Sequence, residues 1–97
     1  MHIGVCRMVL HLPDNHSLKG KRQVARSLTS RIQNKFNVSV AEGEDSELWQ
    51  RLTLVACSVS NDAARAEEVL SQMVSFVADT RPDLELLEYD TEIISGV

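Results

Sequence analysis

The chain has 97 residues, enough for one hydrophobic core and too few for two, so we expect a single domain over residues 1–97. Its composition is 43% hydrophobic and 25% charged, which is typical of a globular domain and excludes disorder or a fibrous repeat. No apolar run approaches the ~20 residues of a membrane span, and two cysteines 51 positions apart form no disulfide framework. We therefore expect a cytoplasmic protein with no membrane partner.

The net charge of −4 hides a strong polarity along the chain. Residues 15–41 contain six basic residues and no acid, a charge of +6, and the remainder carries −10. A local cationic patch attracts polyanions even when the whole protein is acidic. The net charge therefore does not exclude a nucleic-acid partner.

The first half of the chain predicts a strand, a helix and a short strand. His2 to Leu12 is predicted as a strand. Because the residues on both of its faces are largely apolar, it is typical of a central strand. Ser17 is the expected N-cap of a long helix that ends near Phe36. Its buried side is expected to contain Leu18, Val24, Ala25, Leu28, Ile32 and Phe36, while Lys19, Arg22, Arg26 and Gln33 face outward.

The second half begins with that short strand and predicts a long strand, a helix and a last strand after it. Val38 and Val40 begin a short strand, a hairpin loop occupies residues 43–46, and a long strand runs from Leu48 to Ser60. Asn61 or Asp62 caps a second helix, which the segment 80–83 ends. In the last strand we expect one face to hold Leu87, Tyr89, Thr91 and Ile93, and the other Glu88, Asp90 and Glu92.

The resulting order βαββαβ predicts an α+β ferredoxin-like sandwich. Two split β-α-β units with right-handed crossovers give a four-stranded antiparallel sheet in the order 4-1-3-2. The two strands that are apolar on both faces are then the central ones. Both helices cover one face of the sheet, and the other face is left open.

Three segments resemble one bacterial family. They are Ser17-Leu18-Lys19-Gly20-Lys21-Arg22, the run 36–42 (Phe-Asn-Val-Ser-Val-Ala-Glu), and Leu48-Trp49-Gln50-Arg51 followed by Val59-Ser60-Asn61-Asp62. In this order they resemble the YlxP-like proteins over essentially the whole chain. The resemblance implies a ferredoxin-like fold and a cytoplasmic bacterial protein whose genes often lie beside those for translation initiation and ribosome maturation factors. It implies no established activity and no catalytic residue.

The first helix carries the candidate binding site. A helix N-terminus offers free backbone N–H groups, and guanidinium groups grip phosphates with two hydrogen bonds. We expect an interface for the phosphates of RNA, formed by Ser17, Lys19, Lys21, Arg22, Arg26 and Arg31. The alternative interpretation is a solvated helix whose charges balance the acidic remainder of the chain.

Other chemistries lack the residues they need. The segment 20–22 has neither the earlier glycine nor the following Ser or Thr of a P-loop, and no Gly-rich segment matches the phosphate loop of acylphosphatases. The first and third strands lack the central aromatics with which an RNA-recognition motif stacks bases. Trp49 is expected to cover an edge of the core rather than to stack on a base. No nucleophile lies beside a base at predictable proximity, so we expect no enzyme.

Metal and cofactor sites are not expected either. The spacing of His2, His11 and His16 does not fit zinc, and Cys6 and Cys57 are interpreted as small core hydrophobes. The acidic residues Glu42, Glu44, Asp45 and Glu47 have the wrong spacing for an EF-hand and predict a solvated hairpin.

We therefore predict a non-catalytic binding module for RNA or a ribosomal particle. The alternative is a dimeric module that binds a protein or a small ligand. For either function we expect a homodimer, because the open sheet face should mix apolar Ile3, Val5 and Val9 with charged residues.

Overall fold

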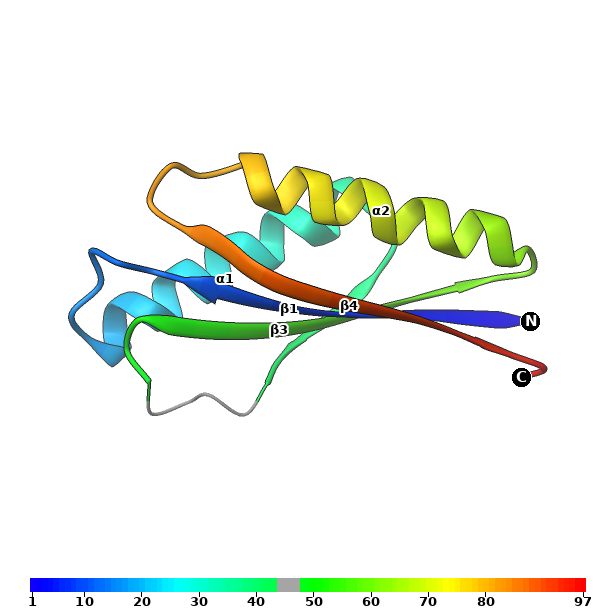
Figure 1. Cartoon of the computed structure of the whole chain (residues 1–97), viewed down its shortest axis with the longest axis horizontal. Coiled ribbons are helices and arrows are strands. Elements are labelled where there is room, and N and C mark those ends of the chain that lie inside the picture. The colour runs from blue at the N-terminus through cyan, green and yellow to red at the C-terminus, as the bar shows by residue number, and fades with distance from the viewer. Residues whose placement is uncertain (44–47) are drawn as a thin grey trace.

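Four antiparallel strands form one sheet in the order β2-β3-β1-β4, and Figure 1 shows both helices on the same face of it. The computed structural model describes residues 1–43 and 48–97. Its elements are β1 (His2–His11), α1 (Leu18–Lys35), β2 (Ser39–Glu42), β3 (Arg51–Ser60), α2 (Ala63–Asp79) and β4 (Glu85–Ser95). The predicted ferredoxin-like fold and its strand order are confirmed.

Both helices begin at residues whose side chains cap them. The Ser17 hydroxyl accepts a hydrogen bond from the Gly20 N–H at 2.9 Å, and the Asp62 carboxylate accepts one from the Ala64 N–H at 2.9 Å. These bonds satisfy N–H groups that have no partner inside the helix. The predicted limits of α1 are confirmed, and Asp62, not Asn61, is the cap of α2. Of the two described helices, neither is long and apolar enough to cross a bilayer.

The core lies between the helices and one face of the sheet. β1 contributes Cys6, Met8 and Leu10, all fully buried, and the helices cover them with Leu28, Ile32, Leu70, Met73 and Val77. Gly4 allows α2 to lie close to β1, because a Cβ there would come within 3.1 Å of Leu70. Side chains of alternate residues in β1, those at odd positions, lie on the opposite, helix-free face of the sheet, which we call the open face.

Strand β3 begins at Arg51, three residues later than predicted. The backbone N–H of Leu12 donates to the Gln50 carbonyl at 2.8 Å, and the Lys21 ammonium donates to the Leu48 carbonyl at 2.9 Å. These contacts hold the segment 48–50 against the end of β1 and the start of α1 instead of in the sheet. The predicted loop beyond Gly43 lies outside the described residues, together with the acidic Glu44, Asp45 and Glu47.

A register shift between Val9 and Leu10 corrects the predicted faces of β4. Leu10 pairs with Leu86 while Val9 pairs with Glu88, so Leu87 is the extra residue of the bulge. Leu87 borders the same pocket as His11 and Trp49, on the open face, and is separated from Tyr89, Thr91 and Ile93. The prediction that these four residues share one face is wrong for Leu87.

The two cysteines lie on opposite faces of the sheet. Cys6 pairs with Ala56 and is fully buried, and Cys57 pairs with Val5 and is half-buried on the open face. Burial of Cys6, with a smaller contribution from the negative charge of Asp90, raises the pKa of its thiol to about 11. The prediction of a core cysteine is confirmed for Cys6 and wrong for Cys57.

We expect the two thiols to differ in reactivity. In the native protein near neutral pH, an aromatic disulfide reagent should modify Cys57 first, because Cys6 is inaccessible and protonated. Cys6 should react only after unfolding in guanidinium chloride. Mass spectrometry of tryptic peptides over time measures both rates, and Cys57→Ser should remove the native reaction. Equal rates for the two cysteines in the native protein would contradict this burial.

Candidate nucleic-acid interface

Three cations of α1 lie on one exposed side of the helix. Lys19, Arg22 and Arg26 are spaced by three and four residues, which places them next to one another along the helix surface. In residues 1–43 and 48–97, no acidic side chain lies within ion-pair distance of any of the three. We call these three residues the cation strip. Their predicted outward orientation is confirmed.

A groove between α1 and β2 borders the cation strip. It has a volume of about 500 Å³, and Arg22 and Arg26 line it together with Thr29, Ser30, Gln33 and Glu42. The two guanidinium groups, the hydroxyls and the amide are hydrogen-bond donors to phosphate and ribose oxygens. Thr29 and Ser30 were not among the predicted site residues, although helical spacing of three and four residues from Arg26 places them beside it.

Lys21 does not belong to this exposed surface. Its side chain is only 4% exposed, and its ammonium group donates a hydrogen bond to the Leu48 carbonyl oxygen at 2.9 Å. A buried ammonium needs such an acceptor, because its desolvation is otherwise costly. This location contradicts the prediction that Lys21 is a phosphate partner; its role is to hold the segment 48–50 against α1.

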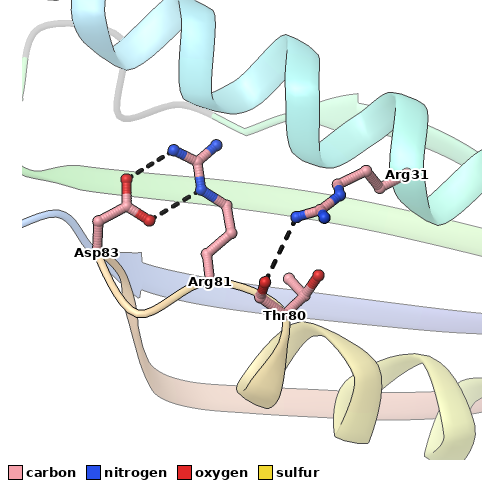
Figure 2. Close-up of polar contacts among 4 residues, drawn as sticks. All are labelled: Arg31, Thr80, Arg81 and Asp83. Atoms are coloured by element: carbon pink, nitrogen blue, oxygen red, sulfur yellow. Dashed lines mark hydrogen bonds and ion pairs between the residues drawn. The ribbon is translucent and has the colours of Figure 1, made fainter.

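The other predicted site residues also have partners within the fold. The Ser17 hydroxyl caps α1. Figure 2 shows Arg31 reaching toward the end of α2, where a guanidinium nitrogen donates to the Thr80 carbonyl at 3.4 Å. Arg31 lies about 140° around the helix from Arg26, so it faces a different side. Lys35, the last residue of α1, is outside the predicted site, and its ammonium lies 4.8 Å from the ring centroid of Phe76.

Arg81 and Asp83 form a two-bond ion pair in the loop between α2 and β4 (Figure 2). The guanidinium nitrogens donate to the two carboxylate oxygens at 2.8 and 2.6 Å. This hydrogen bonding lowers the pKa of Asp83 below its ordinary value and raises that of Arg81. Since the folded pKa of Asp83 is lowered, the pair stabilises the fold above the ordinary carboxylate pKa, and this contribution is lost as the pH falls through the lowered value. Arg81 is thus already neutralised, unlike the cation strip.

Side-chain hydrogen bonds join the segment before α1 to the segment before β3. The Asn15 amide donates to the carbonyl oxygens of Ser17 and Trp49, and the Gln50 amide donates to those of Pro13 and Asn15. A Cβ at Gly20 would lie only 2.1 Å from the Asn15 amide oxygen. Glycine is therefore required at position 20 while Asn15 keeps this position. We call these contacts, with that of Lys21 to Leu48, the α1–β3 clamp.

Gly20→Ala is expected to destabilise the protein although alanine favours a helix. Displacing Asn15 would break two hydrogen bonds worth about 1 kcal/mol each, against a gain of about 1 kcal/mol in helix propensity, so the net loss is about 1 kcal/mol. Urea unfolding followed by circular dichroism measures the change in free energy.

The Asn15→Ala background is the control for this substitution. There Gly20→Ala should be neutral or stabilising, because the clashing amide is gone. A Gly20→Ala protein as stable as the parent in the Asn15 background would contradict the clamp.

Trp49 lies on the surface and not over the core. Its side chain is 53% exposed. Together with Leu48, Leu87, His11 and Arg51 it lines a pocket of about 580 Å³ at one end of the open face. The prediction that Trp49 covers an edge of the core is therefore wrong. Hydrogen bonds of the carbonyl oxygens of residues 48–50 and of the Gln50 side-chain amide join this segment to the rest of the fold.

Known proteins similar to this chain agree with the resemblance in its sequence. The family model described as "Protein of unknown function (DUF503)" matches residues 3–91. The "Uncharacterized protein YlxP" of Bacillus subtilis (strain 168) is 35% identical over 80 residues, which cover 82% of this chain and 84% of that protein. The family match includes the whole of α1 and the clamp.

Proposed function

We propose that this chain, which belongs to the DUF503 protein family, is a non-catalytic RNA-binding module of the cytoplasm that acts on free RNA or on a ribosomal particle. The observation that carries the proposal is the cation strip. Lys19, Arg22 and Arg26 are exposed, adjacent, and without an acidic partner in the described parts of the chain. Phosphates of RNA supply the negative charge that would pair with these three cations.

Helix electrostatics support an external anion at this place. Lys19 lies in the first turn of α1, and that turn contains no acidic residue. The helix dipole makes a cation there mildly unfavourable, so Lys19 does not stabilise the isolated helix. An anion bound across Lys19 and Arg22 offsets this cost.

The arrangement favours binding to the RNA backbone over reading of bases. Among residues 1–43 and 48–97, no aromatic side chain lines the groove beside the strip, and the hydrogen-bond donors of the groove suit phosphate and ribose oxygens. Acidic residues elsewhere repel a polyanion, since all charges of β4 are negative. RNA would therefore approach from the side of α1 and away from β4.

Binding should depend strongly on salt. Three neutralised phosphates predict a slope of about −2 for log K against log salt on single strands, so a fourfold rise in salt weakens binding about 20-fold. Fluorescence anisotropy with a labelled single-stranded RNA of about 12 nucleotides measures the slope. The double variant Arg22→Glu/Arg26→Glu should lose binding to this RNA and cosedimentation with ribosomal subunits, while its circular dichroism stays that of the parent.

Arg65→Glu is the matched control for this experiment. Arg65 is exposed on α2, outside the strip, so the same reversal of charge there should leave affinity nearly unchanged. Parent protein without affinity for RNA at low salt would contradict the proposal. So would a folded Arg22/Arg26 variant that still binds like the parent.

A second candidate function is a homodimeric interaction module built on the open face. Val59 and Ile94 are 59% and 40% exposed there, and they flank Ile3 on neighbouring strands. In the middle of the face, the Arg7 guanidinium lies 3.7 Å from both Glu88 and Asp90. An exposed apolar cluster beside paired charges is typical of an interface.

Val59→Lys/Ile94→Lys tests this second candidate. Sedimentation equilibrium at micromolar concentration should give the parent a mass twice the chain mass of 10.8 kDa, and give the variant the mass of one chain, because two lysines cannot be buried unpaired in an interface. Tyr89→Lys is the control, since Tyr89 is 53% exposed but borders α2 rather than the open face. A parent mass near 10.8 kDa would overturn the dimer.

A further inference from the structure

The outer edge of β4 has no neighbouring strand. β4 is the last strand of the sheet and pairs only with β1, and within residues 1–43 and 48–97 no other segment pairs with its outer side. The edge is 11 residues long, whereas β2 at the opposite edge has four. An edge strand presents N–H and C=O groups ready to pair with another extended segment.

A groove runs beside this edge, between β4 and α2. Its volume is about 490 Å³, and Leu70, Val74 and Ile93 form its apolar part. Exposed Tyr89 and Glu67 lie at its border. A strand edge beside a helix, with apolar pockets between them, is the arrangement in which an extended peptide adds to a sheet: backbone bonds give affinity, and alternate side chains enter the groove.

The charges at this edge select the occupant. Every charged residue of β4 is acidic, namely Glu85, Glu88, Asp90 and Glu92. Arg7 and His11 of β1 lie within ion-pair distance of the first three, while Glu92, and Glu67 of α2, have no ion pair within the described parts of the chain. A second copy of β4 would bring acids opposite acids, which is destabilising. A segment rich in Lys or Arg is complementary.

We propose that β4 and α2 form a docking groove for an extended basic segment of a partner protein, which adds to the sheet as a fifth strand. Backbone groups of β4 hold the segment, and its apolar side chains contact Leu70, Val74 and Ile93 on the helix side. Its alternate side chains, the cations, then lie on the open face beside Glu92, which pairs with Val5. The groove is separate from the cation strip and has the opposite charge. Its occupation does not require that α1 bind RNA.

A synthetic peptide probes the groove directly. A fluorescein-labelled peptide of about eight residues, alternating Lys and Val, matches the length of a strand, and a peptide alternating Glu and Val is its counterpart. We expect the basic peptide alone to bind. At a concentration about ten times its Kd, it should slow hydrogen exchange of outward β4 amides about tenfold and leave the β2 amides unchanged.

Charge reversal at one exposed glutamate of β4 and one of α2 provides the variant and its control. Glu92→Lys should weaken the binding of the basic peptide about fivefold, because Glu92 lies on the open face of β4 beside the lysines of the added strand. Glu68→Lys makes the same change on α2, at an exposed residue outside the groove, and should have little effect. Circular dichroism confirms that both variants fold.

Three results would overturn the proposal. The first is equal binding of the basic and acidic peptides, and the second is equal loss of affinity in the two variants. The third is protection of β4 amides that rises with protein concentration in the absence of peptide, which would assign the edge to a second copy. None of these results affects the cation strip, which is tested with RNA.

Discussion

The α1–β3 clamp sets the rotation of α1, and the rest of the binding surface depends on that rotation. Lys21 turns inward to the Leu48 carbonyl, and Gly20 lies against the Asn15 amide. With these two residues fixed, the neighbouring Lys19 and Arg22 must point outward, and Arg26 follows one turn later. The ammonium of Lys21 thus contributes a hydrogen bond to the scaffold, while the two cations on either side of it remain available to a ligand.

The fold separates the charges of the chain in space as well as in sequence. The basic segment becomes one helix, and seven of the fourteen acids lie on β4, at the other end of the strand order, or at the start of α2, although Glu42 of β2 lines the groove beside the cation strip. Each surface therefore rejects the ligand of the other: the cation strip repels a basic peptide, and β4 repels RNA. Such an arrangement suits a small protein that joins a nucleic acid to a basic protein partner, and ribosomal particles contain both chemistries.

The fold was predictable because the strongest sequence signals agree with one another. β1 and β3 are apolar on both faces and are the central strands, and the helices bury the stripes that their periodicity indicates. Details set by contacts between distant segments were not predictable. Periodicity cannot show that the Lys21 ammonium donates to a carbonyl oxygen 27 residues away. Nor can it show that a bulge places Leu87 on the open face, or that the Trp49 side chain is exposed. The candidate site was thus half predicted: Lys19, Arg22 and Arg26 are exposed together, whereas Ser17, Lys21 and Arg31 bond within the fold.

The segments that carry the family resemblance therefore divide into scaffold and surface. Three residues of these segments are structural. The Ser17 hydroxyl caps α1, the missing side chain of Gly20 leaves space for the Asn15 amide, and the Lys21 ammonium holds the segment before β3. Lys19 and Arg22 make no comparable contact within the described residues. A substitution in the first group changes stability, and any loss of binding follows from the displaced helix. A substitution in the second group leaves the fold intact, so it is at these two positions, with Arg26, that a change in binding reports on function alone.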